Sequence, residues 1–125
     1  MEPDNDKTDD ADTTAYQPVP RVVLPRVNRP SRLQLVRGPG APLNIPLAAD
    51  EIVIGRSTGA DLSFEVGGLS RRHVLLRKSG TEYVCKDLDS RNGVFLNGIR
   101  IYSVTLRNGD TLQIGDLVFL FEQGD

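Results

Sequence analysis

The sequence predicts an all-β protein, an antiparallel β-sandwich, from about residue 31 onward. Short segments rich in Val, Ile, Leu and Phe recur along this part of the chain, and clusters of Gly, Asn and Pro separate them. This pattern is typical of many short strands joined by tight turns. No window of helical length shows apolar residues recurring every 3.6 positions, so no helix is expected. Roughly ninety residues are enough for two small sheets packed face to face.

Seven segments carry the strand pattern, each with alternating or continuous apolar residues. They are 32–36, 51–55, 73–78, 82–88, 93–97, 111–115 and 117–122. The Ser-Gly-Thr sequence at 79–81 predicts a tight hairpin, and Asn-Gly pairs at 92–93, 97–98 and 108–109 predict further turns, because both residues tolerate positive φ. We expect the core to contain Val53, Leu75, Leu112, Ile114, Phe119 and Phe121.

The first thirty residues differ in composition from the rest. Six acidic residues and one lysine lie between residues 1 and 16, and low hydrophobicity combined with like charge predicts disorder. Four prolines and three arginines follow between residues 17 and 30, which predicts an extended linker. We therefore assign residues 1–30 to a disordered tail and residues 31–125 to one folded domain.

Bulk composition limits the possible function and location. A single cysteine, Cys85, excludes an internal disulfide, and no segment has the pattern of a signal peptide or a membrane-spanning helix. We expect a cytoplasmic protein with no membrane partner. The net charge of −2 argues against general nucleic-acid binding.

Three segments near the ends of predicted strands carry polar groups that strand formation does not use. They read GR at 55–56, LSRRH at 69–73 and DLDSRNG at 87–93. Loops gather at the two ends of a sandwich, so these segments can share one end. They would then bring together guanidinium, hydroxyl and amide groups from Arg56, Ser70, Arg71, Arg91 and Asn92. Such a set suits a phosphate group, and a solvated basic surface is the alternative interpretation.

Catalytic and metal-binding interpretations fit these residues less well. Ser70 and His73 lie close together in sequence, and Asp87 or Asp89 could orient the imidazole ring. The chain has no nucleophile elbow or oxyanion loop, and a histidine that enters an apolar strand is typically structural. One His and one Cys cannot form a usual zinc site. We expect neither an enzyme nor a cofactor.

The order and spacing of these motifs resemble the forkhead-associated (FHA) domain family. The matching residues are Gly55-Arg56, Ser70-Arg71-Arg72-His73, the Asp-x-x-Ser-x-Asn-Gly run at 87–93, and Asn97-Gly98. The resemblance extends over about residues 33–121. It implies an eleven-stranded β-sandwich that binds phosphothreonine peptides through loops at one end, without catalysis, in Ser/Thr kinase signalling. The implied partners are a phosphothreonine-containing protein and a Ser/Thr kinase, and we expect a monomer.

The resemblance also implies a role for each matching residue. Arg56 would bond the phosphate, Ser70 would donate its hydroxyl to it, and Asn92 would hold the peptide backbone. Arg71 and Arg91 would contact phosphate or peptide. Structural support of the site is implied for Gly55, His73, Gly93, Asn97 and Gly98.

The tail holds two adjacent threonines, Thr13 and Thr14, in acidic sequence, with Tyr16 shortly after them. This stretch is similar to the twin-threonine motif of small actinobacterial FHA regulators. In those proteins the phosphorylated threonine binds the protein's own FHA domain and switches off binding to enzymes of the 2-oxoglutarate node. The resemblance implies that either threonine is a phosphorylation site and that the tail is a ligand.

Two further interpretations remain open. A basic nucleic-acid-binding sandwich could use Arg71, Arg72 and the arginines of the linker, and a steep salt dependence of affinity would support it. The other is an interaction module that does not depend on phosphate. The presence of Arg56, Ser70 and Asn92 argues against it.

Overall fold

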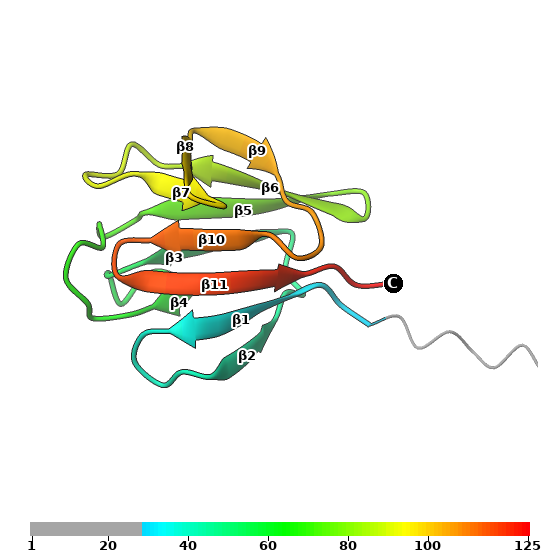
Figure 1. Ribbon diagram of the computed structural model, residues 1–125, viewed down its shortest axis with the longest axis horizontal. Coiled ribbons are helices and arrows are strands. Elements are labelled where there is room, and N and C mark those ends of the chain that lie inside the picture. Colours follow the sequence, from blue (N-terminus) through cyan, green and yellow to red (C-terminus); the bar gives the residue numbers. More distant parts are fainter. Residues whose placement is uncertain (1–28) are drawn as a thin grey trace, which may run out of the picture.

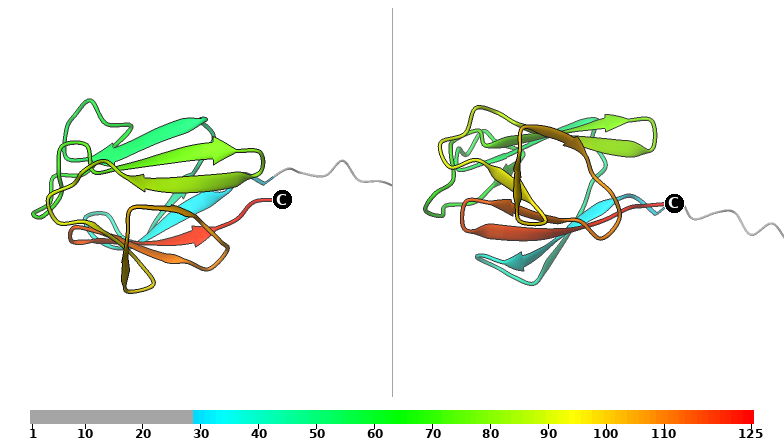
Figure 2. Two further views of the ribbon diagram at one scale, coloured as in Figure 1. Left: turned by 90° about the horizontal axis from the view of Figure 1, so that it is seen from above. Right: turned by 45° about the horizontal axis from the view of Figure 1, so that its top comes forward.

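The computed structural model describes residues 29–125, which form two β-sheets packed face to face. Figure 1 shows the strands, and Figure 2 shows the two sheets as separate layers. One sheet contains β1 (Arg32–Arg37), β2 (Leu43–Pro46), β7 (Val94–Leu96), β8 (Ile99–Ile101), β10 (Thr111–Ile114) and β11 (Leu117–Glu122). The other contains β3 (Glu51–Gly55), β4 (Leu62–Ser63), β5 (Val74–Ser79), β6 (Glu82–Asp87) and β9 (Ser103–Thr105). The predicted all-β sandwich of about eleven strands is confirmed.

Strand order explains how distant segments meet. The larger sheet has the order β2-β1-β11-β10-β7-β8 and the smaller sheet β4-β3-β5-β6-β9. All pairs are antiparallel except β3 with β4, where Ile54 pairs in parallel with Leu62. The chain passes between the sheets after β2, β6, β8 and β9. The β6–β7 loop lies at one end of the sandwich (Figure 1). The C-terminus and the β5–β6 turn lie at the other end (Figure 1).

The core lies between the two layers. Leu112, Ile114, Phe119 and Phe121 are buried in it, as predicted, because alternate residues of β10 and β11 face inward. Phe64 and Phe119 pack edge to face, as do Tyr83 and Phe121, at ring-centroid distances of 5.9 and 6.5 Å. Together these contacts link the two sheets.

The expectation that Leu75 is a core residue was wrong. Val74 and Leu76 are the inward residues of β5, and Leu75 is half-buried on the outer face. Its strand partner Val53 is buried but lies outside the main apolar cluster. A run of three apolar residues does not show which of them face the core, and pairing with β3 and β6 decides it.

Two of the turns predicted from the sequence are found in β-hairpins. Gly80, with a φ of 63°, forms with Thr81 the turn between β5 and β6. Asn97 and Gly98 have φ values of 50° and 84° and form the two-residue turn between β7 and β8. The Asn92-Gly93 and Asn108-Gly109 pairs lie instead in loops that connect one sheet to the other.

The predicted disordered tail lies outside the described residues, apart from Arg29 and Pro30. These two residues lie beside the C-terminal segment, where Asp125 N–H donates to Arg29 O and Ser31 Oγ accepts from Gly124 N–H. The boundary at residue 31 stays a prediction.

Cys85 lies in β6 and is fully buried in the core. Burial raises the pKa of its thiol to about 12, and the negative charge of Asp87 adds to the shift. The thiol is therefore protonated at neutral pH and behaves as a small apolar side chain.

Candidate functional site

Three loops border one open hollow of about 530 Å³ at the end of the sandwich opposite the C-terminus. These loops follow β3, precede β5 and connect β6 to β7. The structure brings together all five residues that the sequence predicts to bind phosphate or peptide. The residues that line the hollow, called the groove below, are Arg56, Val66, Gly67, Gly68, Leu69, Ser70, Arg71, Arg91 and Asn92.

Arg56 is positioned by close contact between two backbone segments. Its N–H donates to Ser70 O at 2.9 Å, and Ser57 N–H donates to Arg71 O at 3.1 Å. A Cβ on Gly55 would lie only 2.0 Å from Arg71 O, so glycine is needed where β3 ends. The Nε of Arg56 donates to Leu69 O at 3.3 Å. No hydrogen bond within residues 29–125 uses its two Nη nitrogens, which remain available for a ligand in the groove.

Ser70 presents a hydroxyl whose acceptor role is already in use. Its Oγ accepts the N–H of Arg91 at 3.0 Å, which joins the β4–β5 loop to the β6–β7 loop. The hydroxyl hydrogen can therefore be donated to an anion in the groove. Asn92 makes a second link between the same loops, because its Nδ2 donates to Gly68 O at 2.9 Å.

His73 lies beneath the groove and is fully buried. Its Nδ1 accepts the N–H of Ser70 at 3.0 Å, so Nε2 carries the proton and donates to Gly93 O at 2.7 Å. The ring thus joins both groove loops from inside. Neither ring nitrogen bonds Ser70 Oγ, so the pair lacks the geometry of a serine nucleophile and its base.

The sequence did not identify the residues that shape the β6–β7 loop from within. Ser90 N–H donates to Asp87 Oδ1 at 2.9 Å, and Ser90 Oγ accepts the N–H of Gly93 at 3.0 Å. Gly93 has a φ of 84°, which favours glycine. Asp-x-x-Ser is a pattern in which short polar side chains bond nearby backbone, and this signal was present in the sequence.

Two predicted supporting residues lie away from the groove. Asn97 and Gly98 form the β7–β8 turn, and Asn97 bonds Asp110 and the N–H of Thr111 at 3.0 and 2.9 Å. Thr111 begins β10, and Gly115 directly follows its other end, next to Gly68, so the β7–β8 turn supports the opposite end of the larger sheet.

Charge in the groove has one sign. Its lining includes three arginines, Arg56, Arg71 and Arg91, and no acidic residue. All three are exposed, and Arg72 next to them is exposed but does not line the groove. Cations beside hydroxyl and amide donors are chemically suited to a doubly charged oxyanion.

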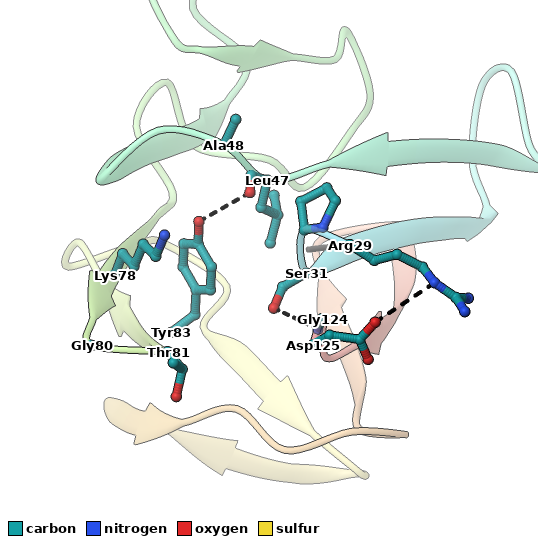
Figure 3. Close-up of a pocket in the computed structure, with 11 residues that line it drawn as sticks. Arg29, Ser31, Leu47, Ala48, Lys78, Gly80, Thr81, Tyr83, Gly124 and Asp125 are labelled. Carbon is teal, nitrogen blue, oxygen red and sulfur yellow. Dashed lines mark hydrogen bonds and ion pairs between the residues drawn. The ribbon is translucent and has the colours of Figure 1, made fainter. Parts of the chain in front are cut away.

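A second hollow of about 420 Å³ lies at the opposite end and contains none of the predicted site residues (Figure 3). Lys78, Thr81 and Tyr83 line it together with the first and last described residues. The Tyr83 hydroxyl donates toward Leu47 O and Ala49 O, both at 3.2 Å. Loss of hydration raises the pKa of this hydroxyl, and the charge of Asp50 adds to the shift.

Residues 29–125 contain neither a cluster of metal ligands nor a membrane-spanning helix. No group of three or more His, Cys, Asp or Glu side chains in this part of the chain could hold a metal ion. The same part contains no helix long and apolar enough to cross a membrane.

Several known proteins are similar in sequence to this chain. An oxoglutarate dehydrogenase inhibitor from Corynebacterium jeikeium is 34% identical over 92 residues, which cover 74% of this chain and 64% of that protein. The glycogen accumulation regulator GarA of Mycolicibacterium smegmatis is also 34% identical over 92 residues, or 74% of this chain and 58% of GarA. The chain thus spans somewhat under two thirds of the length of these two relatives.

Solved structures of other proteins are also similar to this chain. Mycobacterium tuberculosis EmbR, in complex with a low-affinity phosphopeptide, has a TM-score of 0.70 and 34% identity over 75% of this chain and 24% of EmbR. A structure from a structural and functional analysis of phosphothreonine-dependent FHA domain interactions has a TM-score of 0.68 and 28% identity over 74% of this chain and 95% of that one. The model of the FHA domain family matches residues 52–115, which include all three groove loops. This chain belongs to the FHA domain family.

Proposed function

We propose that this protein is a non-catalytic, phosphothreonine-dependent protein-binding module in Ser/Thr kinase signalling. The observation that carries the proposal is the groove, in which Arg56, Arg71, Arg91, Ser70 and Asn92 meet without a carboxylate in the lining. A phosphothreonine has a charge of about −1.5 to −2 at neutral pH and three strong acceptor oxygens. The groove supplies donors for that charge.

Each groove residue has a part in this proposal. The free Nη nitrogens of Arg56 form a fork that matches two phosphate oxygens, and the Ser70 hydroxyl donates to another oxygen. Asn92, held beside Gly68, bonds the peptide backbone next to the phosphothreonine. Arg71 and Arg91 contact phosphate or peptide from the two sides of the groove.

Relatives of known role support a regulatory module in place of an enzyme. The C. jeikeium relative is an inhibitor of oxoglutarate dehydrogenase, and GarA and EmbR are regulators. The bonds of His73 to Ser70 N–H and Gly93 O support the same conclusion, because they occupy both ring nitrogens.

Titration with three matched peptides tests the proposal. The peptides carry Thr, phosphothreonine or phosphoserine at one position, and calorimetry measures the dissociation constants. We expect binding of the phosphothreonine peptide and no measurable binding of the Thr peptide. Equal affinity for these two peptides would show that the module is phosphate-independent. Equal affinity for single-stranded DNA at low salt, with a steep salt dependence, would favour the nucleic-acid alternative.

A second candidate function is autoinhibition, in which phosphorylated Thr13 or Thr14 occupies the groove of its own chain. The observation that favours it is the pair of threonines in acidic sequence, together with relatives that are an inhibitor and a regulator. About fifteen residues separate Thr14 from Arg29. Fully extended, they span about 50 Å, which exceeds the roughly 25 Å expected for twice the radius of gyration of such a domain.

Autoinhibition predicts a shift in the groove when the tail is phosphorylated. In the phosphorylated full chain, we expect the backbone resonances of Ser70 and Asn92 to move by NMR, at all protein concentrations. The same chain should bind an added phosphothreonine peptide more weakly than the unphosphorylated chain, because tethering gives the tail an effective concentration of about a millimolar. A Thr13→Ala, Thr14→Ala double variant is the control. Unchanged groove resonances after phosphorylation would contradict autoinhibition.

A further inference from the structure

One wall of the groove is adjacent to a turn that the functional motifs do not include. The turn joins β10 to β11 and consists of Gly115 and Asp116. A Cβ on Gly115 would lie 2.9 Å from Gly68 O, so the turn packs directly on the backbone of the groove lining. A Cβ on Gly67 would lie 3.6 Å from Asp116 Oδ2. The carboxylate of Asp116 therefore lies over the glycine pair at 67–68.

Asp116 is exposed and has no cationic partner within the described part of the chain. The ion pairs there join Arg29 to Asp125, Arg32 to Glu122 and Arg77 to Glu51. No hydrogen bond within residues 29–125 uses the Asp116 carboxylate. Its negative charge therefore remains available to a ligand that passes Gly67 and Gly68.

The groove is therefore lined by positive charge, and a negative charge lies just outside one of its ends. Arg56, Arg71 and Arg91 lie on the side of the phosphate donors, and Asp116 lies beyond the glycine pair. Asn92 lies between these ends, since its Nδ2 bonds Gly68 O. A peptide with its phosphate at the arginines and its backbone at Asn92 extends past Gly68 on one side. Four extended residues span about 13 Å, which is enough to reach Asp116.

We propose that Asp116 is a specificity-determining residue that selects phosphothreonine peptides with an Arg or Lys side chain on one flank, within about four residues of the phosphothreonine. This inference rests on the proposed function of the groove. The pair formed would be an exposed ion pair, so its effect is modest and sensitive to salt. An acidic side chain at the same peptide position would be repelled.

The inference has a consequence for the tail of this chain. No Lys or Arg occurs between Lys7 and Arg21, so neither Thr13 nor Thr14 has a cation within five residues. The phosphorylated tail would therefore gain nothing from Asp116, and a partner with a flanking Arg would bind more tightly in a direct comparison of free peptides.

A position-scanned peptide set tests the role of Asp116. Each peptide has a central phosphothreonine in an alanine background, with Arg, Ala or Glu placed singly at each of the four positions on either side. Fluorescence anisotropy at low and high salt measures the affinities. For the wild-type protein we expect Arg to bind about two- to fivefold more tightly than Ala at one or two positions on a single flank, as for an exposed ion pair.

Two variants separate Asp116 from general charge effects. Asp116→Asn should abolish the preference for Arg, and Asp116→Lys should make Glu the preferred residue at the same positions. Glu82→Gln makes the same change in charge at the exposed β5–β6 hairpin, away from the groove, and should retain the preference.

The outcomes distinguish this inference from the proposed function. Phosphate-dependent binding of the all-alanine peptide without any preference for Arg would overturn the role of Asp116 and leave the proposed function intact. A preference for Arg that Asp116→Asn retains would also overturn it. No phosphate-dependent binding of any peptide would overturn both.

Discussion

Replacing Arg56 with alanine is expected to lower affinity for a phosphothreonine peptide by about tenfold to a hundredfold. A hydrogen bond that involves a charged group contributes roughly 1.5–3 kcal/mol net, and this range converts to that loss of affinity. The side chain is held by the bond from its Nε to Leu69 O and has both Nη nitrogens free. Calorimetric titration of wild type and variant with one phosphopeptide measures the difference.

Arg72 offers a matched control for Arg56. It is exposed in the same region but does not line the groove, so Arg72→Ala should change affinity less than twofold. Arg56→Lys should recover only part of the affinity, because an ammonium keeps the charge but not the planar fork. Equal losses from Arg56→Ala and Arg72→Ala would indicate a diffuse basic surface and contradict a specific phosphate contact.

Replacing His73 with alanine is expected to lower the free energy of unfolding by about 3 kcal/mol. The substitution leaves the N–H of Ser70 and the carbonyl of Gly93 without their partner and creates a cavity under the groove. An unsatisfied buried polar group costs roughly 1–3 kcal/mol, and the lost packing adds to this cost. Urea unfolding followed by circular dichroism measures the change in the free energy of unfolding. The slope of that free energy against urea concentration should be the same for both proteins.

His73 should affect phosphopeptide binding indirectly, by holding the two groove loops in place. Where His73→Ala is still folded, phosphopeptide affinity should fall, because the ring joins the loop of Ser70 to the loop of Gly93. Tyr102→Ala is the control, because this ring is exposed with Arg100 over it, and its loss should lower the free energy of unfolding by under about 0.5 kcal/mol. A stable His73→Ala variant would show that other contacts hold the two loops together.

Seven of the eleven strands could be predicted, and the other four show why the remainder could not. Three of them are short: β4 has two residues, and β8 and β9 have three each, without the continuous apolar run that marks the equally short β7. β2 ends in Pro46 and is largely exposed, so it lacks both alternation and a continuous apolar run. All four are edge strands of the two sheets, and each forms because a neighbouring strand supplies its hydrogen-bonding partners.

The sequence by itself determined the fold class, the position of the long strands and the set of groove residues. Alternation of apolar residues, turn chemistry at Gly80 and Asn97, and the motif residues from Gly55 to Gly93 are local properties that can be read along the chain. They were sufficient to nominate Arg56, Ser70 and Asn92.

Only the tertiary structure decided how these residues meet. The outward position of Leu75 depends on pairing with β3 and β6, and the neighbourhood of Asp116 and Gly67 depends on two loops from different sheets. The bonds of His73 to Ser70 and Gly93 span 3 and 20 residues of sequence, respectively. A sequence pattern reports which face of a strand is apolar, but contacts between distant segments arise from strand pairing and sheet packing, which no local pattern contains.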